Sequence, residues 1–416
     1  MTRKVRIIGG GLTGMLASLE AHRLGFQDIE LHDPADRLGG TALPRMDHGR
    51  ELRDRCQYFG PVGDPVRSLM ASHGIAFEDF ENRIGSVSPA PGGDLTYSRG
   101  FAGPALYTRE LDLAPIRGDS LADRLRAYPA DIQGHLTRYC RWYLGAWLDE
   151  VHASSAQAMG IGKVFPTSAD PADLAATRRS LPLFNDLYDL PAALTGRLDG
   201  LTASLPEGGM TSAVLKLQQA LIRSGVKIKT PSLVSPDSAL AEHGPDDILI
   251  WAANPMPLFK ALDLVTPRAS SKTLTTYVFR LDPAGAAPFQ LHNFTATGAV
   301  SQISVYETRG QILLSAECVE EVGDVDLRRE IHRLMAGFGG AGMTIQEQLA
   351  VTMAPRWGCP TVETVRGIAQ LRALIGRRYG SSLVTGGWEA GDLTGRFTAI
   401  GTELATARQG AVAAAA

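Results

Sequence analysis

Paired cysteines are missing from this sequence. The four cysteines, Cys56, Cys140, Cys318 and Cys359, lie far apart along the 416 residues. Structural zinc sites and redox dithiols need cysteines separated by about two to four residues, and neither spacing occurs. We therefore expect reduced, buried cysteines and no metal site.

Long hydrophobic runs and an excess of basic charge are also missing. The apolar stretch DILIWAANPMPLF is interrupted by Pro255 and Pro257, and it is shorter than the roughly 20 residues that cross a bilayer. The formal net charge is −3, whereas nucleic acids and anionic membranes select basic surfaces. The N-terminus lacks the separate apolar region of a signal peptide. We expect a cytoplasmic protein with no nucleic-acid or membrane partner.

Glycine, in contrast, is concentrated in the stretch RIIGGGLTGMLAS, residues 6–18. The branched residues before it predict a strand buried on both faces, and the leucine spacing after it predicts a helix that begins at Leu12 and ends at Gly25. Gly9, Gly11 and Gly14 stand in the G-x-G-x-x-G register. In dinucleotide-binding turns these glycines permit a tight turn, close approach of a pyrophosphate, and close packing of helix on sheet.

This turn predicts a phosphate site at the helix N-terminus, formed by backbone amides from Gly11 through Leu12 and Thr13 to Gly14. Asp33 follows the second predicted strand, DIELHD, where a carboxylate would accept hydrogen bonds from a ribose and disfavour a 2′-phosphate. The alternatives are a glycine-rich turn without a ligand and, for Asp33, a solvated turn residue.

A second glycine pair follows in DPADRLGGTA, which contains Arg37, Gly39 and Gly40. This stretch resembles the R-x-G-G element of the superfamily that includes FAD-dependent amine oxidases, protoporphyrinogen oxidase and UDP-galactopyranose mutase. A plain NAD domain has no need of such a cation and glycine pair beside the phosphates, so the resemblance favours FAD over NAD. The alternative is an ordinary type II turn.

Two later segments resemble the same superfamily. LPEGGMTSAVLKLQQALIRSGVKIKT predicts a helix over about residues 211–223 and then a strand, whose backbone contacts the adenine end of the flavin nucleotide in the family. The C-terminal segment SSLVTGGWEAGDLTGRFTAIG predicts a strand, a loop and a helix beginning near Ile400, whose N-terminus lies near the flavin pyrimidine in the family. The resemblance implies cofactor contacts at Val226, Lys227, Ile228, Gly387, Trp388, Thr398 and Ile400.

The resemblance implies an α/β fold with a Rossmann-like, GR2-type FAD-binding domain built from discontinuous segments and a mixed α+β substrate domain. We expect the FAD-binding domain to comprise residues 1–95, 205–270 and 340–416, and the substrate domain residues 96–204 and 271–339. The first substrate segment is helical by pattern, with an apolar stripe of Leu136, Tyr139, Tyr143, Trp147 and Leu148. The second contains three predicted strands, SKTLTTYVFRL, VSQISVY and QILLSAEC.

Motifs for side-chain nucleophiles, zinc hydrolysis or nucleotide phosphates (Ser/His/Asp order, H-E-x-x-H, P-loop) are missing, which leaves flavin chemistry as the predicted reaction. Amine oxidases carry a lysine on a substrate-domain strand. Here the matching strand offers Thr275 and Thr276, with Lys272 slightly earlier, either as a base or as a surface residue. Residues 290–317 resemble mutase-like flavoproteins instead. The candidate catalytic residues in this stretch are His292, Asn293, Tyr306 and Glu317; the alternative is that these residues are structural.

The stretch GRELRDRCQYFGP lies where the family's chain passes beneath the flavin. Arg53, Arg55, Gln57 and Tyr58 are candidates to contact an acidic substrate or the flavin edge, or else to fix the loop. We predict an FAD-dependent oxidoreductase that oxidises a small biosynthetic intermediate by hydride transfer to flavin N5, as a monomer or homodimer. The alternatives are a mutase-like isomerase of a sugar pathway and a non-catalytic flavoprotein.

Overall fold

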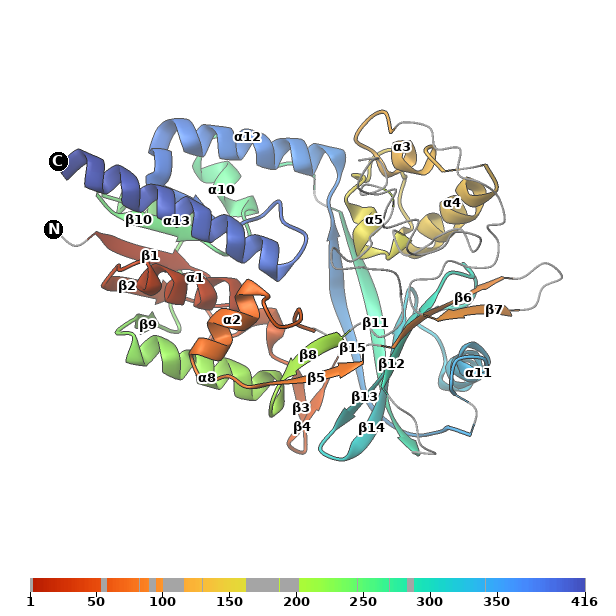
Figure 1. The fold of residues 1–416 in the computed structure, drawn as a ribbon. Coiled ribbons are helices and arrows are strands. Elements are labelled where there is room, and N and C mark those ends of the chain that lie inside the picture. The colour runs from red at the N-terminus through yellow and green to blue at the C-terminus, as the bar shows by residue number, and fades with distance from the viewer. Residues whose placement is uncertain are drawn as a thin grey trace.

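The computed structural model describes residues 3–53, 58–81, 83–89, 95–99, 116–128, 130–161, 187, 202–244, 246–268, 270–282, 288–340 and 342–415. Figure 1 shows two parts side by side, a helix-flanked sheet that contains the N-terminal strand and a second sheet with short helices at one end. The predicted fold class, α/β with a Rossmann-like part and a mixed second part, is confirmed.

The first sheet has five parallel strands in the order β16-β10-β1-β2-β9. Its strands come from three separated stretches of the chain: β1 (Lys4–Ile8), β2 (Asp28–His32), β9 (Lys227–Lys229), β10 (Ile248–Trp251) and β16 (Leu383–Thr385). One face is covered by α1 (Leu12–Arg23), α8 (Gly209–Arg223) and α13 (Leu393–Ala415). The other face is covered at β10 and β16 by α9 (Pro236–Ala241), α10 (Met256–Ala261) and α12 (Val362–Tyr379). A 3-10 turn (Gly380–Ser382) connects α12 to β16.

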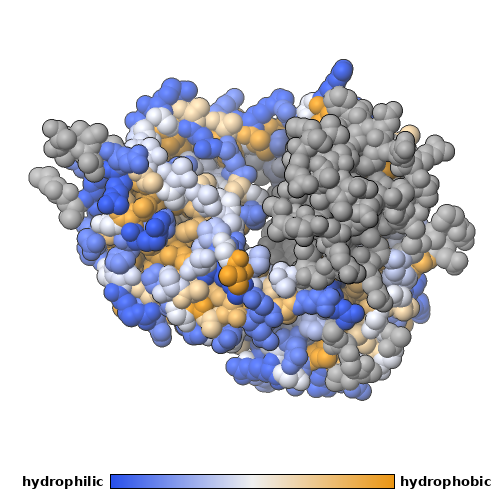
Figure 2. Space-filling view, in the orientation of Figure 1, coloured by the Kyte–Doolittle hydropathy of each residue, from blue (hydrophilic) through white to orange (hydrophobic). Residues whose placement is uncertain are grey.

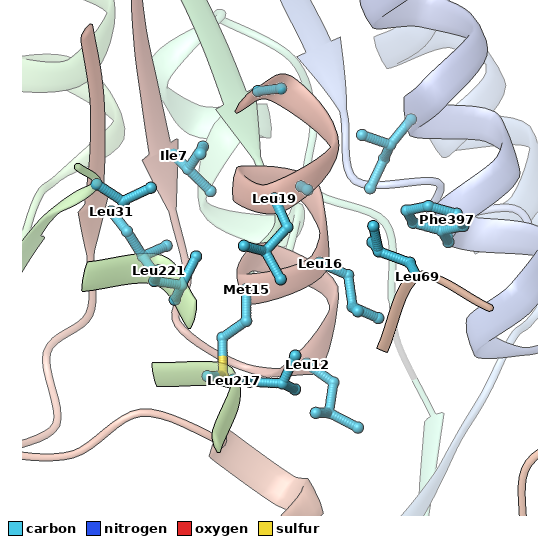
Figure 3. Packing of buried hydrophobic residues seen from close by; sticks show 14 of the residues in the cluster. Ile7, Leu12, Met15, Leu16, Leu19, Leu31, Leu69, Leu217, Leu221 and Phe397 are labelled. Carbon is cyan, nitrogen blue, oxygen red and sulfur yellow. The ribbon is translucent and has the colours of Figure 1, made fainter. Parts of the chain in front are cut away.

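The core beneath α1 explains why the N-terminal stretch folds as strand and helix. Ile7 of β1 and Leu31 of β2 are fully buried against Met15, Leu16 and other α1 side chains (Figure 3). Burying a side chain of this size stabilises the fold by about 1.5–3 kcal/mol. The predicted helix therefore forms with its apolar face on the sheet.

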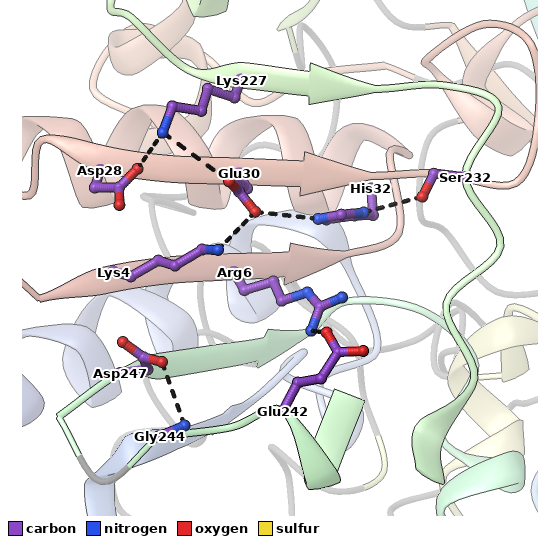
Figure 4. Close-up of polar contacts among 10 residues, drawn as sticks. All are labelled: Lys4, Arg6, Asp28, Glu30, His32, Lys227, Ser232, Glu242, Gly244 and Asp247. Carbon is purple, nitrogen blue, oxygen red and sulfur yellow. Dashed lines mark hydrogen bonds and ion pairs between the residues drawn. The ribbon is translucent and has the colours of Figure 1, made fainter. Parts of the chain in front are cut away.

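The opposite face of β1 and β2 is charged, which for β1 differs from the predicted burial on both faces. Lys4 Nζ lies 3.0 Å from a Glu30 carboxylate oxygen, and Lys227 Nζ lies 2.8 Å from Asp28 Oδ1 (Figure 4). Burial and then the positive charge of Arg6 lower the pKa of His32, at the end of β2. The alternating sequence of β2 thus reflects one apolar and one charged face.

The second sheet has seven strands in the order β15-β11-β14-β13-β12-β6-β7. All neighbours are antiparallel except β12 and β6, so the sheet is mixed, and the three strands predicted in its second segment are confirmed. The strands are β6 (Ile84–Pro89), β7 (Leu95–Arg99), β11 (Ser270–Asp282), β12 (Phe289–Asn293), β13 (Val300–Thr308), β14 (Gln311–Cys318) and β15 (Thr344–Cys359). Helix α11 (Asp324–Met335) packs on one face.

A helical insert covers one end of the other face of this sheet. It contains α3 (Leu121–Leu125), α4 (Ala130–Leu144) and α5 (Ser155–Ala158). Four members of the predicted apolar stripe are buried here, but Trp147 is 68% exposed because it lies in the turn after α4. Burial raises the pKa of the Cys140 and Cys318 thiols, which fits the expected reduced cysteines.

Sheet pairing divides the chain differently from the expected domain boundaries at two places. Strands β6 and β15 fall in segments assigned to the FAD-binding domain, yet both pair within the seven-stranded sheet.

The remaining elements are the hairpin β3 (Arg45–Asp47) and β4 (Arg50–Leu52), the pair β5 (Phe77–Glu81) and β8 (Thr202–Pro206), helix α2 (Pro65–Ser72) and a 3-10 turn (Gly40–Ala42).

The described surface carries scattered hydrophobic residues among hydrophilic ones. Figure 2 shows them over the region of α8, whose Leu215 and Ile222 are 55% and 59% exposed. Within the described ranges, no helix combines the length and apolar character needed to cross a membrane. The same residues contain no group of three or more His, Cys, Asp or Glu side chains placed to hold a metal ion.

Candidate active site

The turn between β1 and α1 needs glycine at two positions for different reasons. Gly9 has a φ of +109°, and a Cβ there would lie 2.9 Å from Ala253 N. At Gly14 a Cβ would lie 1.8 Å from Gly9 O, so a side chain would force α1 away from β1. At Gly11 no atom lies within 4 Å of the position that a Cβ would occupy. The backbone at Gly11 therefore borders open space.

The N-terminus of α1 faces that space without a cap of its own. Gly11 is the N-cap residue, no side chain accepts a hydrogen bond from the first-turn amides, and the first turn contains no acidic residue. The amides of Leu12, Thr13 and Gly14 thus stand at the positive end of the helix. This arrangement suits an anionic ligand such as a phosphate.

The loop with the second glycine pair lies against this turn. Gly39 N donates a 2.8 Å hydrogen bond to Gly10 O, and Gly39 and Gly40 have φ angles of +114° and +55°. A Cβ at Gly40 would lie 3.2 Å from Gly11 Cα, so the two loops approach backbone to backbone. Arg37 is exposed beside them. The structure thus brings both predicted glycine motifs to one place.

Asp33 joins the same cluster from the end of β2. Its carboxylate accepts hydrogen bonds from Gly10 N at 2.6 Å and from Ala35 N at 2.8 Å, and each oxygen retains a lone pair for a ligand hydroxyl. Ser232 N donates to Asp33 O at 2.7 Å, and Ser232 Oγ lies 3.0 Å from His32 Nδ1 (Figure 4).

The segment predicted for the adenine contact lies earlier along the chain than Ser232. Val226 is buried below α8, and Lys227 is opposite Glu30 in the sheet, with Ile228 next to it. The chain reaches Asp33 only from Lys229 onward. The proline at position 231 marks the end of this strand, and Ser232 follows it.

At the C-terminal segment, the helix begins earlier than predicted. Helix α13 starts at Leu393, about two turns before the expected start near Ile400, which was wrong. Asp392 accepts a hydrogen bond from Gly395 N at 2.6 Å and so caps the helix. Thr398 Oγ1 donates to Thr394 O within the helix, and the Ile400 side chain is fully buried in the core.

Gly387 and Trp388 lie between β16 and this helix. Gly387 has a φ of +64°, and a Cβ there would lie 2.6 Å from Arg396 Cα. Trp388 Nε1 donates a 3.0 Å hydrogen bond to Trp251 O at the end of β10. The loop after β16 is therefore held at the same carboxyl edge of the sheet as the glycine turn, where ligands bind in open parallel sheets.

The second sheet presents a row of polar side chains on the face opposite α11. Residues directly opposite one another in neighbouring strands point to the same side. By this register one line crosses six strands, and we call it the polar row: Thr352, Thr276, Glu317, Gln302, His292 and Ser86. Glu317 is 5% exposed, and its carboxylate accepts a 3.4 Å hydrogen bond from Tyr143 Oη of the insert.

Arg53 links β4 to this face of the sheet. Arg53 N donates to Tyr306 Oη at 2.9 Å, and Ser315 Oγ donates to Arg53 O at 2.8 Å. The side chain at Tyr306 points to the same side as Ser315 and the polar row, by the pairing of β13 with β14. Tyr58 lies nearby in sequence, 5.0 Å from the Phe80 ring between centroids, whereas Gln57 and Arg55 lie outside the described residues.

Lys272 is separated from His292 and the rest of the polar row. It lies on β11 four residues before Thr276, about 13 Å along the strand. Its Nζ lies 3.8 Å from the position of a Cβ at Gly145, in the helical insert. Of the three predicted catalytic residues, the structure thus places His292 in the polar row and Tyr306 against Arg53, with Lys272 farther away.

Comparison with known proteins agrees with this geometry. A family model described as a NAD(P)-binding Rossmann-like domain matches residues 7–72, the part with both glycine motifs. No curated protein sequence matches the chain significantly. Among solved structures, reduced UDP-galactopyranose mutase superposes with a TM-score of 0.67 over 97% of this chain and 93% of that chain, at 14% identity.

Two oxidases also match over nearly their whole length. A proposed protoporphyrinogen oxidase from Exiguobacterium sp. 255-15 has a TM-score of 0.62 at 14% identity and 98% coverage of each chain. Cyclohexylamine oxidase from Brevibacterium oxydans has a TM-score of 0.55 at 13% identity, covering 98% of this chain and 99% of that chain. The chain has the amine oxidase-like fold. The resemblance first indicated by the glycine motifs is confirmed at the level of the amine oxidase-like fold.

Proposed function

We propose that the protein is an FAD-dependent oxidoreductase that oxidises a small molecule by hydride transfer from a substrate C–H bond. The observation that carries this proposal is the open space at Gly11, bordered by uncapped helix amides and by the second glycine pair, on a chain with the amine oxidase-like fold. The second pair favours FAD, because a nicotinamide dinucleotide needs only the first turn.

The residues of the parallel sheet fit this cofactor. The amides of Leu12, Thr13 and Gly14 would hold its phosphates, and Asp33 would hold ribose hydroxyls. The loop that holds Gly387 and Trp388, followed by the first turn of α13 at Leu393, would lie beside the cofactor at the same edge of the sheet. When bound, FAD supplies the redox chemistry as a two-electron acceptor.

The polar row would contact the substrate. Glu317 is a buried carboxylate, and its Oε atoms would accept a proton from a substrate N–H or O–H group. His292 and Thr276, in the same row, would donate or accept hydrogen bonds. We assign Tyr306 to positioning Arg53 and give Lys272, at the insert, a structural role.

A mutase-like isomerase is the second candidate, favoured by the polar character of this face. A row of carboxylate, amide, imidazole and hydroxyl groups suits a molecule with many hydroxyl groups, such as a sugar. An isomerase would use the reduced cofactor without net oxidation of its substrate.

Purified protein titrated with FAD tests the proposal. We expect tight binding, seen as a visible absorbance spectrum that stays with the protein after gel filtration. A panel of small acids, amines and sugars is then added anaerobically to the oxidised holoenzyme. Loss of visible absorbance with a panel member supports the oxidoreductase. Turnover only after prereduction, with the spectrum left reduced, favours the isomerase, and failure to bind FAD refutes both.

A further inference from the structure

We propose that Arg53 binds an acidic group of the substrate, so that the substrate is an oxyanion-bearing molecule rather than a simple amine. This inference rests on the proposed function, because it names the substrate class of the same site. Arg53 directly follows β4 and lies against the polar-row face of the seven-stranded sheet.

The position of Arg53 is fixed from three sides. Its N–H donates to Tyr306 Oη, and its carbonyl accepts from Ser315 Oγ. Its guanidinium Cζ lies 5.2 Å from the centroid of the Tyr306 ring, which is 1% exposed. A cation held in this way loses little conformational entropy when a ligand binds.

Arg53 has no counter-ion within the part of the chain that the structure describes. Among the described residues its guanidinium has no ion pair, and its Nε is shielded from solvent without a hydrogen-bond partner. Arg50, three residues earlier, differs in both respects, because its guanidinium donates to Asp47 Oδ2 at 2.7 Å and to Gln311 Oε1 at 2.6 Å. A partly buried cation without a counter-ion is costly, so an external anion fits this position.

The nature of the side chain and its neighbours narrows the ligand further. A guanidinium matches the two oxygens of a carboxylate or a phosphate with parallel hydrogen bonds. Glu317 lies two residues beyond Ser315 on β14, about 7 Å along the strand. A small acid that also carries an N–H or O–H group could therefore contact Arg53 at one end and face Glu317 at the other. A simple cationic amine would be repelled by Arg53.

Calorimetric titration of the FAD-loaded protein tests this inference with four probes. Benzoate and inorganic phosphate represent the two oxyanions, benzamide is the neutral analogue of benzoate, and benzylamine is the cationic one. We expect benzoate or phosphate to bind, and benzamide and benzylamine to bind at least about tenfold more weakly. Whichever oxyanion binds more tightly identifies the acidic group.

Variants then assign the effect to one residue. Arg53→Met is expected to weaken oxyanion binding about 10- to 100-fold, and Arg53→Lys less, because it keeps the charge but loses the planar fork. Arg50→Met is the matched control, since it removes a cation that is already paired and should bind the oxyanion as the wild type does. Thermal unfolding of each variant shows whether it is folded.

Three results would overturn the inference. The first is that benzylamine binds as tightly as either oxyanion. The second is that Arg53→Met and Arg53→Lys both bind oxyanions as the wild type does. The third is that Arg53→Met loses FAD affinity while Arg50→Met keeps it. The last would mean that the guanidinium serves the cofactor. FAD uptake is read from the visible spectrum and oxyanion binding from the heat of titration of the protein with and without FAD. A failure of the proposed function is therefore seen separately from a failure of the Arg53 assignment.

Discussion

Alanine at Gly14 and alanine at Gly11 are expected to have opposite effects on folding and on FAD binding. At Gly14 the new methyl group would lie 1.8 Å from a backbone oxygen, which cannot rotate away. Forcing a group into a filled space of this kind costs about 1–3 kcal/mol, and the protein's whole stability is of the order of 5–15 kcal/mol. Gly14→Ala should therefore lower the free energy of unfolding measurably.

At Gly11 the methyl group would contact nothing in the protein. Alanine is a poorer N-cap residue than glycine by about 0.5–1 kcal/mol, but it also reduces the entropy of the unfolded chain by a similar amount. The free energy of unfolding should thus change by less than about 0.5 kcal/mol. The methyl group would, however, occupy the space in front of the α1 amides.

The expected loss of FAD affinity follows from the hydrogen bonds that this methyl group blocks. Two amide–phosphate hydrogen bonds at about 1.5 kcal/mol each give about 3 kcal/mol, or roughly a 150-fold weaker dissociation constant. Urea unfolding of the FAD-free variants measures the first effect, and quenching of flavin fluorescence during titration measures the second. The reasoning is wrong if Gly11→Ala binds FAD within about threefold of the wild type, or if it loses as much stability as Gly14→Ala.

Two further predictions concern stability. Glu51, which is 7% exposed, accepts hydrogen bonds from Met210 N and Thr211 N at the start of α8, so Glu51→Ala should lower the urea unfolding free energy by about 3 kcal/mol and Glu51→Gln by about 1 kcal/mol. Equal losses in the two variants would contradict this capping role. Burial, and then Arg138, lowers the pKa of His135 to about 4 from the ordinary 6.5. The unfolded chain therefore takes up this proton first, and stability should fall by about 3 kcal/mol as the pH drops from about 6.5 to about 4, a loss that His135→Leu should remove. An unchanged pH dependence in that variant would refute the assignment.

The sequence predicted best those features that local residues determine. Gly9, Gly11 and Gly14 stand within six residues, and their roles as tight turn, open backbone and close contact appear in the structure as the motif implies. The same holds for β2, which was predicted from the stretch DIELHD and forms at Asp28–His32. In both cases the physical cause lies within one strand or one turn.

Features that depend on distant pairing were predicted less well. No local pattern shows that β6 and β15 pair with strands of the other sheet, because their partners are set by long-range packing. Trp147 fits the helical period of the apolar stripe, but the chain leaves the helix at Leu144, before reaching it. The start of α13 was missed although Asp392, an N-cap residue, gave a local signal.

The polar row could not have been found from the sequence. Gln57, another candidate, lies outside the described residues. The six members of the row come from six strands, and only the register places Thr276 opposite Glu317, or Gln302 opposite His292. Single residues such as Glu317 could be named as candidates from the resemblance, but their shared face required the sheet itself.

The placement of α13 against α1 has a consequence for how the chain folds during synthesis. Arg3 donates a hydrogen bond to the carbonyl of Ala407, 404 residues away, and β16 forms an edge of the parallel sheet that begins with β1. The first strands and helix emerge from the ribosome long before these partners do. Until α13 is made, the part of α1 that packs against it stays exposed even when β1, β2 and α8 are in place, so this half of the molecule should complete its folding late and slowly.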